Sequence, residues 1–137
     1  MNPVPEALPL ITPHLIVKDA ARAIDFYRAA LDCNELYRVA DPGGRILFAE
    51  LLLGSSRIFL VDEFPEQRAL SPLSLGGSPV TLHVYFSDVD RAYRRAVQAG
   101  MTVEIPLADF FWGERYGSLR DPFGLQWAAA FYGRDRS

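Results

Sequence analysis

The spacing of hydrophobic residues near the start of the chain predicts a strand followed by a helix. Residues 11–17 (ITPHLIV) alternate enough for a strand, which places Thr12, His14 and Ile16 on one face. Asp19 follows, and its carboxylate is suited to accept the free N–H groups of the first turn of a helix. Beyond it, apolar residues recur at helical spacing along one stripe: Ala20, Ala23, Ile24, Tyr27, Ala30 and Leu31.

Three short strand patterns follow this helix. They cover residues 35–40, 45–53 and 57–61, and the turn sequences DPGG and GSS separate them. The first half of the chain is therefore predicted to be a β-α-β-β-β unit. The pattern then gives way to residues 64–79, which are rich in Pro, Ser and Gly and are typical of a linker.

The second half of the chain repeats the first at a constant offset of 69 positions. Thr12 pairs with Thr81, His14 with His83 and Asp19 with Asp88. A helix capped by Asp88 and ended by Gly100 is expected, followed by strands at 102–106, 115–120 and 125–131. We therefore predict one domain over residues 1–137, made of two β-α-β-β-β modules at about residues 9–62 and 80–132.

Composition narrows the class of protein. The 137 residues suit one domain, and 50% of them are hydrophobic, enough for a packed core. A net charge of −3 gives no basic surface for nucleic acid. Neither a signal peptide nor a membrane span is evident, so we expect a soluble cytoplasmic protein. The single cysteine, Cys33, is expected to be a small buried residue and not a nucleophile.

The repeated modules, together with VKDAARAIDFYRAAL in the first and FWGERYG and RDPFG in the second, resemble the vicinal oxygen chelate superfamily. This superfamily contains glyoxalase I, bleomycin resistance proteins and extradiol dioxygenases, and the chain is most similar to its PhnB-like branch. The resemblance implies an α/β (α+β) fold in which two tandem modules form a curved mixed sheet. It also implies that a small organic molecule binds in the cavity of that sheet.

The resemblance also implies where a metal centre would lie. Metal-dependent relatives carry ligands at four repeat-related positions, which correspond here to Thr12, Thr81, Ala128 and Ile58, or to Phe59 if the hairpin slips by one residue. None of these is a strong ligand for Zn²⁺, Fe²⁺ or Mn²⁺. We therefore expect no standard metal centre and predict no cofactor. One alternative is a displaced site for Fe, Mn or Zn made by His14, His83 and Glu50.

Other interpretations stay open for these and for the remaining candidate residues. The two histidines can also line a cavity or be structural, and Glu50 is either a cavity acid or an outward residue paired with an Arg such as Arg45. Trp112 and Tyr116 could stack on a ligand, or could plug the end of the sheet or a dimer contact. Arg115 could bind an anion, or, like Arg120, pair with Glu114 or Asp121.

The leading hypothesis is a homodimer that binds a small organic molecule, with the reaction, if any, unknown. Its candidate cavity residues are His14, Glu50, His83, Trp112, Arg115 and Tyr116. The competing hypothesis is a metal-dependent lyase, dioxygenase or isomerase that uses the displaced site. The sequence leaves open whether the modules pair within the chain or across the dimer.

Overall fold

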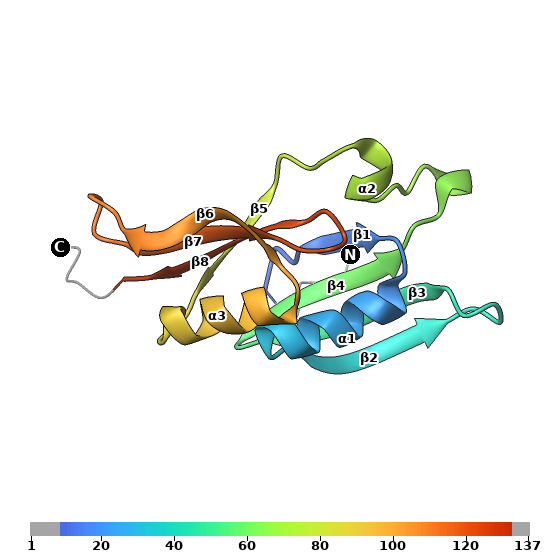
Figure 1. The fold of residues 1–137 in the computed structure, drawn as a ribbon. Helices are drawn as coiled ribbons and strands as arrows, with labels where there is room; N and C mark the ends of the chain where they lie inside the picture. Colours follow the sequence, from blue (N-terminus) through green and yellow to red (C-terminus); the bar gives the residue numbers. More distant parts are fainter. Residues whose placement is uncertain (1–8, 133–137) are drawn as a thin grey trace.

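The first module forms its own four-stranded sheet with a helix on one face. The structure, a computed structural model, describes residues 9–132. The module consists of β1 (His14–Val17), α1 (Ala20–Leu31), β2 (Asn34–Ala40), β3 (Ile46–Leu53) and β4 (Ser56–Asp62). Its strands lie in the order β1-β4-β3-β2, with β1 parallel to β4 and the other pairs antiparallel (Figure 1).

The second module has the same topology. It consists of β5 (Thr81–Tyr85), α3 (Val89–Ala99), β6 (Thr102–Asp109), β7 (Arg115–Arg120) and β8 (Gln126–Phe131). These strands lie in the order β5-β8-β7-β6, and β5 is parallel to β8. The predicted α+β fold of two β-α-β-β-β modules is therefore confirmed, with two separate four-stranded sheets.

Three details differ from the sequence prediction. Strand β1 begins at His14 and not at residue 11, because Pro13 lacks the N–H that a ladder needs and offers only its carbonyl, to the Phe59 N–H at 2.9 Å. Strand β6 runs three residues further than expected, to Asp109. The segment 64–79 contains two short helical turns, η1 (Pro65–Gln67) and α2 (Pro72–Leu75).

The predicted helix caps are present. The Asp19 side chain accepts the Arg22 N–H at 3.3 Å, and the Asp88 side chain accepts the Arg91 N–H at 3.2 Å. Gly100, at φ +125°, ends α3 in the region that favours glycine. The same local chemistry therefore begins the helix of each module.

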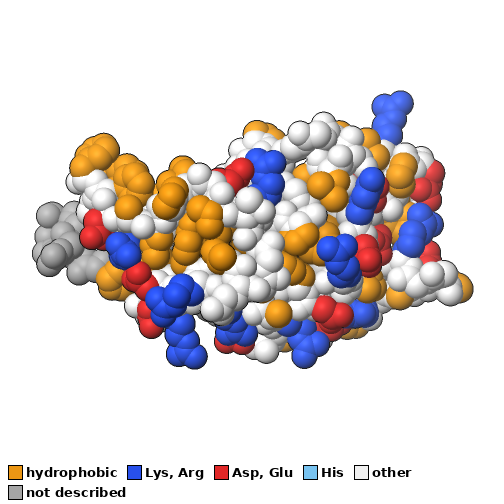
Figure 2. Space-filling model, in the orientation of Figure 1, with side chains coloured by type: hydrophobic (Ala, Val, Ile, Leu, Met, Phe, Trp, Pro, Cys, Tyr) orange, Lys and Arg blue, Asp and Glu red, His pale blue; other side chains and the backbone are white. Residues whose placement is uncertain are grey.

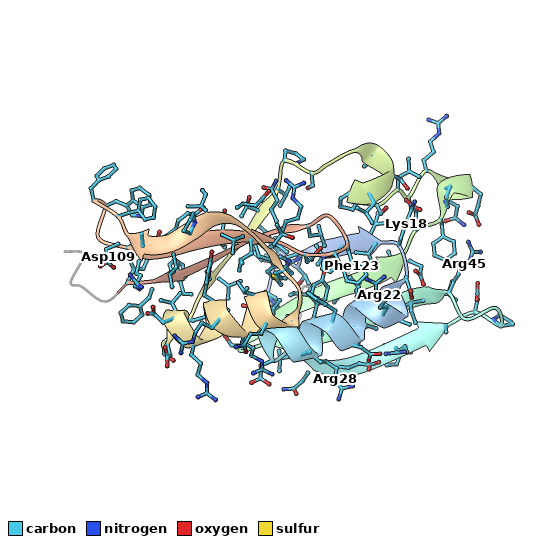
Figure 3. All side chains as sticks on the ribbon, viewed as in Figure 1. Lys18, Arg22, Arg28, Arg45, Asp109 and Phe123 are labelled. Carbon is cyan, nitrogen blue, oxygen red and sulfur yellow. The ribbon has the colours of Figure 1, made fainter. Side chains whose placement is uncertain are left out.

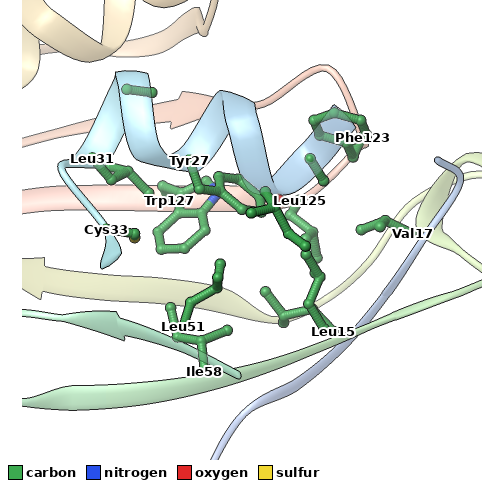
Figure 4. Close-up of a cluster of buried hydrophobic side chains, with 14 of the residues drawn as sticks. Leu15, Val17, Tyr27, Leu31, Cys33, Leu51, Ile58, Phe123, Leu125 and Trp127 are labelled. Carbon is green, nitrogen blue, oxygen red and sulfur yellow. The ribbon is translucent and has the colours of Figure 1, made fainter. Parts of the chain in front are cut away.

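The two helices pack against each other, and one hydrophobic core joins the modules (Figure 1). Tyr27 points from α1 toward Trp127 of β8, and Leu51 and Ile58 of the first sheet face the same cluster (Figure 4). The ring centres of Tyr27 and Trp127 are 5.5 Å apart. Cys33 lies in this core as predicted, and burial raises the pKa of its thiol to about 12.

Polar contacts also hold α1 to the second module. Arg95 of α3 donates from Nε to the Ala29 carbonyl at 2.7 Å, near the end of α1 where helix carbonyls lack partners. At the other end of α1, Arg22 lies beside Phe123, with its guanidinium carbon 5.1 Å from the ring centre (Figure 3). Both ends of the helix are thus fixed to the other half of the chain.

The carboxylate of Asp121 is the central buried polar group between the modules. Its Oδ2 accepts the Tyr27 hydroxyl at 2.5 Å and the Trp127 indole N–H at 2.8 Å. Its Oδ1 accepts the N–H groups of Phe123 at 2.8 Å and Leu125 at 3.0 Å. Burial raises the pKa of the Asp121 carboxyl, although these hydrogen bonds act to lower it. The pKa of Tyr27 is raised well above its ordinary value by burial and by the charge of Asp121.

The expectation that Arg115 or Arg120 pairs with Asp121 or Glu114 is wrong. Asp121 is saturated by four uncharged donors, and Arg120 forms its ion pair with Glu104 at 2.8 Å. Arg115 pairs with Asp90 at 2.7 Å and Asp109 at 3.3 Å. Within residues 9–132, no helix is long and apolar enough to cross a membrane.

Removing the Tyr27 hydroxyl tests how strongly the Asp121 cluster holds the modules together. Tyr27→Phe is expected to lower the free energy of unfolding by about 1.5–3 kcal/mol, because it deletes one hydrogen bond to a buried carboxylate. Urea denaturation measures this change. The control, Tyr37→Phe, alters an exposed tyrosine and should stay within about 0.5 kcal/mol of the wild type. Equal effects of the two substitutions would contradict the assignment.

Candidate functional site

Each sheet presents one face to the shared core and the opposite face outward. Side chains alternate along the strands, so Leu51, Ile58 and Trp127 face the core while Glu50, Phe59 and Ala128 lie on the opposite faces. The shared core occupies the helix side of both sheets, so the outward faces point away from it. Candidate binding residues must therefore be sought on these two outward faces.

The outward face of the first sheet, here called the first face, carries a row of aromatic rings and an ion pair whose two charges balance each other. It carries His14, Tyr37, Phe48, Glu50, Arg57 and Phe59. The rings form a row, with Phe59 4.9 Å from Phe48 and 6.3 Å from His14 between ring centres. Glu50 forms an ion pair with Arg57. The interpretation of Glu50 as an outward residue paired with an arginine is confirmed, but the partner is not Arg45, which lies with Asp41 and Glu66.

The outward face of the second sheet, here called the second face, gathers aromatic side chains around one carboxylate. The aromatic cluster consists of His83, Tyr85, Phe110, Trp112, Tyr116 and Tyr132. Tyr116 stacks on His83 with ring centres 5.6 Å apart, and Trp112 stacks on Phe110 at 4.7 Å. Three predicted site residues, His83, Trp112 and Tyr116, therefore lie together.

Glu114 is the carboxylate of this cluster, and only 4% of its side chain is exposed. It accepts the Trp112 indole N–H at 2.9 Å and lies 3.2 Å from the His83 Nε2. Burial acts to raise the pKa of the Glu114 carboxyl, but hydrogen bonds from Trp112, His83 and Tyr132 outweigh it, and the pKa lies below its ordinary value. The group is thus held as an anion beneath aromatic rings.

Sequence reasoning did not select Glu114 as a cavity residue, although a signal was present. Glu114 stands two positions before Tyr116, so strand alternation places both side chains on the same face. Arg115, which was selected, lies between them and therefore projects to the helix side, where its Nη2 is 2.7 Å from Asp90 of α3. Asp109, its second partner, lies at the outer end of β6 (Figure 3). Arg115 is not part of the second face.

Strand register corrects one of the four positions that correspond to metal ligands in the superfamily. His14 is paired with Phe59, and its repeat mate His83 is paired with Ala128. Phe59 and not Ile58 is therefore equivalent to Ala128, and Ile58 is buried on the opposite side of the sheet. The four positions then hold Thr12, Phe59, Thr81 and Ala128, a donor set that does not fit a divalent metal.

The displaced metal site is not assembled within one chain. His14 and Glu50 lie on the first face, whereas His83 lies on the second, against Glu114. Across residues 9–132, no three His, Cys, Asp or Glu side chains are grouped so that they could hold a metal ion. The residues that were proposed as a set are therefore divided between two surfaces.

A groove runs beside the second face, between the modules. Its volume is about 590 Å³, and it is bounded by the β3–β4 hairpin on one side and by β5 on the other. Arg57, His83 and Tyr85 contribute polar atoms, while Leu53, Ile58, Leu82 and Trp127 are among its apolar walls. His83 and Tyr85 therefore belong both to this groove and to the aromatic cluster.

The family follows from comparison with known proteins. Residues 8–129 match the model of the Glyoxalase/Bleomycin resistance protein/Dioxygenase superfamily. The chain belongs to this superfamily. The resemblance inferred from its repeated modules is thereby confirmed, and the superfamily includes proteins of several different activities.

Similar proteins match most of the chain. An uncharacterized protein of Mycobacterium tuberculosis H37Rv is 46% identical over 123 residues, which cover 88% of this chain and 72% of the relative. Solved structures include an Arabidopsis thaliana gene product with 27% identity and a TM-score of 0.72, covering 90% of this chain and 98% of that one. A PhnB protein from Bacillus cereus, at 18% identity and a TM-score of 0.70, covers 90% of this chain and 99% of its own and shares the fold.

The hydrogen bonds to Glu114 make a testable prediction about its ionisation. Trp112→Phe removes the indole donor, so the pKa of the Glu114 carboxyl should rise toward that of an ordinary glutamate, about 4.3. Carbon-13 NMR titration of the side-chain carboxyl measures this shift. Phe111→Leu, a change at an exposed neighbouring ring, is the control and should leave the pKa in place.

The same group sets the direction of a pH effect on stability. Because the folded-state pKa is lowered, the contribution of the Glu114 carboxylate is present above the pKa of an unfolded glutamate and is lost as the pH falls through the lowered value. Trp112→Phe should reduce this loss. A pKa unaffected by Trp112→Phe would show that the indole bond does not hold the anion.

Proposed function

We propose that this protein binds a small, flat organic molecule on the second face and in the adjoining groove. The observation that carries the proposal is the exposure of aromatic rings around an ordered polar centre: Tyr85 is 54% exposed and Trp112 is 43% exposed. Exposed aromatic rings offer large stacking area with little conformational freedom to lose. Exposed Phe111 and Ile105 add apolar surface near the cluster, and Figure 2 shows hydrophobic side chains gathered at this end of the molecule.

The groove supports the same location. Its volume of about 590 Å³ lies in the range of small-molecule sites, which are mostly apolar and carry a few polar groups for orientation. His83 and Tyr85 join it to the aromatic cluster, so one molecule can contact both. The competing metal-dependent function lacks comparable support, because its ligands lie on separate faces of the chain.

Proton–nitrogen NMR with 4-methylquinoline, a neutral flat probe at about pH 8, tests the binding proposal. The indole signal of Trp112 reports on the second face, and a backbone signal in the distant turn between β2 and β3 serves as the control. The Trp112 signal should shift and saturate with a dissociation constant of about 1 mM, the affinity expected for a fragment of this size. The backbone N–H signal of Gly44, which lies in the DPGG turn and donates to the Asp41 carbonyl, should stay in place.

Two substitutions locate the probe. Tyr116→Ala on the second face should weaken binding at least about fivefold, because it removes a stacking surface. Tyr37→Ala, the matched change on the first face, should not. Absence of any saturable shift on the second face, with either 4-methylquinoline or its cationic analogue N-methylquinolinium, would refute the proposed function.

We also propose that the protein is a homodimer in which a second copy covers the first face. The pairing of Glu50 with Arg57 leaves that face neutral, and its row of aromatic rings resembles the apolar centre of a dimer interface. Analytical ultracentrifugation should find a dimer. Phe59→Asp should give a folded monomer by sedimentation and circular dichroism, whereas Val97→Asp on α3 should remain dimeric. A monomeric wild type would refute this proposal.

A further inference from the structure

The two outward faces differ in how their carboxylates are neutralised. On the first face, Glu50 is paired with the guanidinium of Arg57. On the second face, Glu114 is held by the indole N–H of Trp112 and by His83, which is charged only when protonated. Arg115 projects to the other side of the strand and is already paired with Asp90 and Asp109. Among the described residues, Glu114 therefore has hydrogen-bond donors but no permanently cationic partner.

The position of Glu114 makes its charge effective. Its side chain is 4% exposed, so water adjacent to the carboxylate is largely excluded and does not screen it as it would a surface glutamate. The rings around it add to the same field, since the face of an aromatic ring is the negative part of its quadrupole. The buried anion and the electron-rich ring faces therefore both attract positive charge.

The hydroxyl group of Tyr85, within the aromatic cluster, is affected by the negative charge of Glu114. Tyr85 donates to the Tyr132 hydroxyl at 3.0 Å, and that bond, partial burial and the charge of Glu114 together raise the pKa of Tyr85 to about 12. Tyr85 therefore stays protonated near neutral pH and adds no second negative charge. Its ring, more than half exposed, remains an electron-rich surface within reach of the Glu114 field.

We propose that the second face selects an organic cation, an aromatic or quaternary ammonium group whose positive charge lies over the aromatic cluster above Glu114. This inference rests on the proposed binding function and specifies its ligand class. Attraction between cations and ring faces, together with the buried carboxylate, gives the cation its advantage over a neutral molecule of equal shape. The first face lacks this property because Arg57 already neutralises Glu50.

A matched pair of probes tests the inference on the unmodified protein. N-methylquinolinium carries a fixed positive charge, and 4-methylquinoline is a neutral molecule of the same size at about pH 8. Calorimetry or the Trp112 indole titration should give a dissociation constant roughly tenfold lower for the cation. Equal or tighter binding of the neutral probe would overturn the cation inference and leave the binding function standing. If neither probe binds, both proposals fail.

Three variants assign the preference to Glu114. Glu114→Gln keeps the shape and an acceptor for Trp112, and should reduce cation affinity about tenfold with little change for the neutral probe. Glu66→Gln, a change at an exposed glutamate that is paired with Arg45 and does not line the groove, should have no effect. His83→Arg places a permanent charge beside Glu114 without altering the carboxyl and should also abolish the preference. Retention of the preference in both Glu114→Gln and His83→Arg would overturn the assignment.

Discussion

The burial of the Asp121 carboxylate is the constraint on which the arrangement of the two modules depends. A carboxylate in this position is costly unless its oxygens are satisfied, and four donors satisfy it. One donor, Tyr27, comes from α1 of the first module, while Trp127 and two backbone N–H groups come from the second. The hydrogen bonds therefore fix the position of α1 against β8, where dispersion and hydrophobic contacts alone would tolerate sliding.

That arrangement determines which surfaces remain for function. Since one core takes the helix sides of both sheets, both outward faces are left uncovered within the chain. Local sequence then makes them chemically different. The ion pair of Glu50 with Arg57 neutralises one face, whereas Trp112 and His83 hold Glu114 as an anion on the other. Divergence of a few side chains on a repeated scaffold is sufficient to give the two outward faces different charge.

Most of the fold could be predicted from the sequence because its signals are local and occur twice. Helical spacing, the Asp19 and Asp88 caps and the constant offset of the repeat each constrain the same elements. His83 and Tyr116, which were both predicted to be cavity residues, lie together on the second face. Register was harder to predict, because a tight turn can shift a strand by one residue and exchange its faces, as with Ile58 and Phe59. Arg115 and Glu114 need no such shift, because alternation alone places Glu114 with Tyr116 and turns Arg115 to the helix side.

The contact of Asp121 with Tyr27 could not be predicted, because it joins residues 94 positions apart in the chain. RDPFG carries a strong local turn pattern, which explains the backbone bonds but gives no information about a tyrosine in the other module. Neighbouring acids and arginines suggested ion pairs instead. The actual partners depend on how α1 docks against β8, a tertiary property that single-sequence patterns do not encode.

The shared core also bears on the origin of the repeat. A solitary ancestral module would have exposed the surface through which Tyr27 now meets Trp127, and such an apolar surface requires a companion in water. The ancestor would therefore have been stable chiefly as an assembly of two modules. Fusion of two such copies would have made that association intramolecular, which removes its dependence on concentration and lets each half acquire side chains that the other does not share.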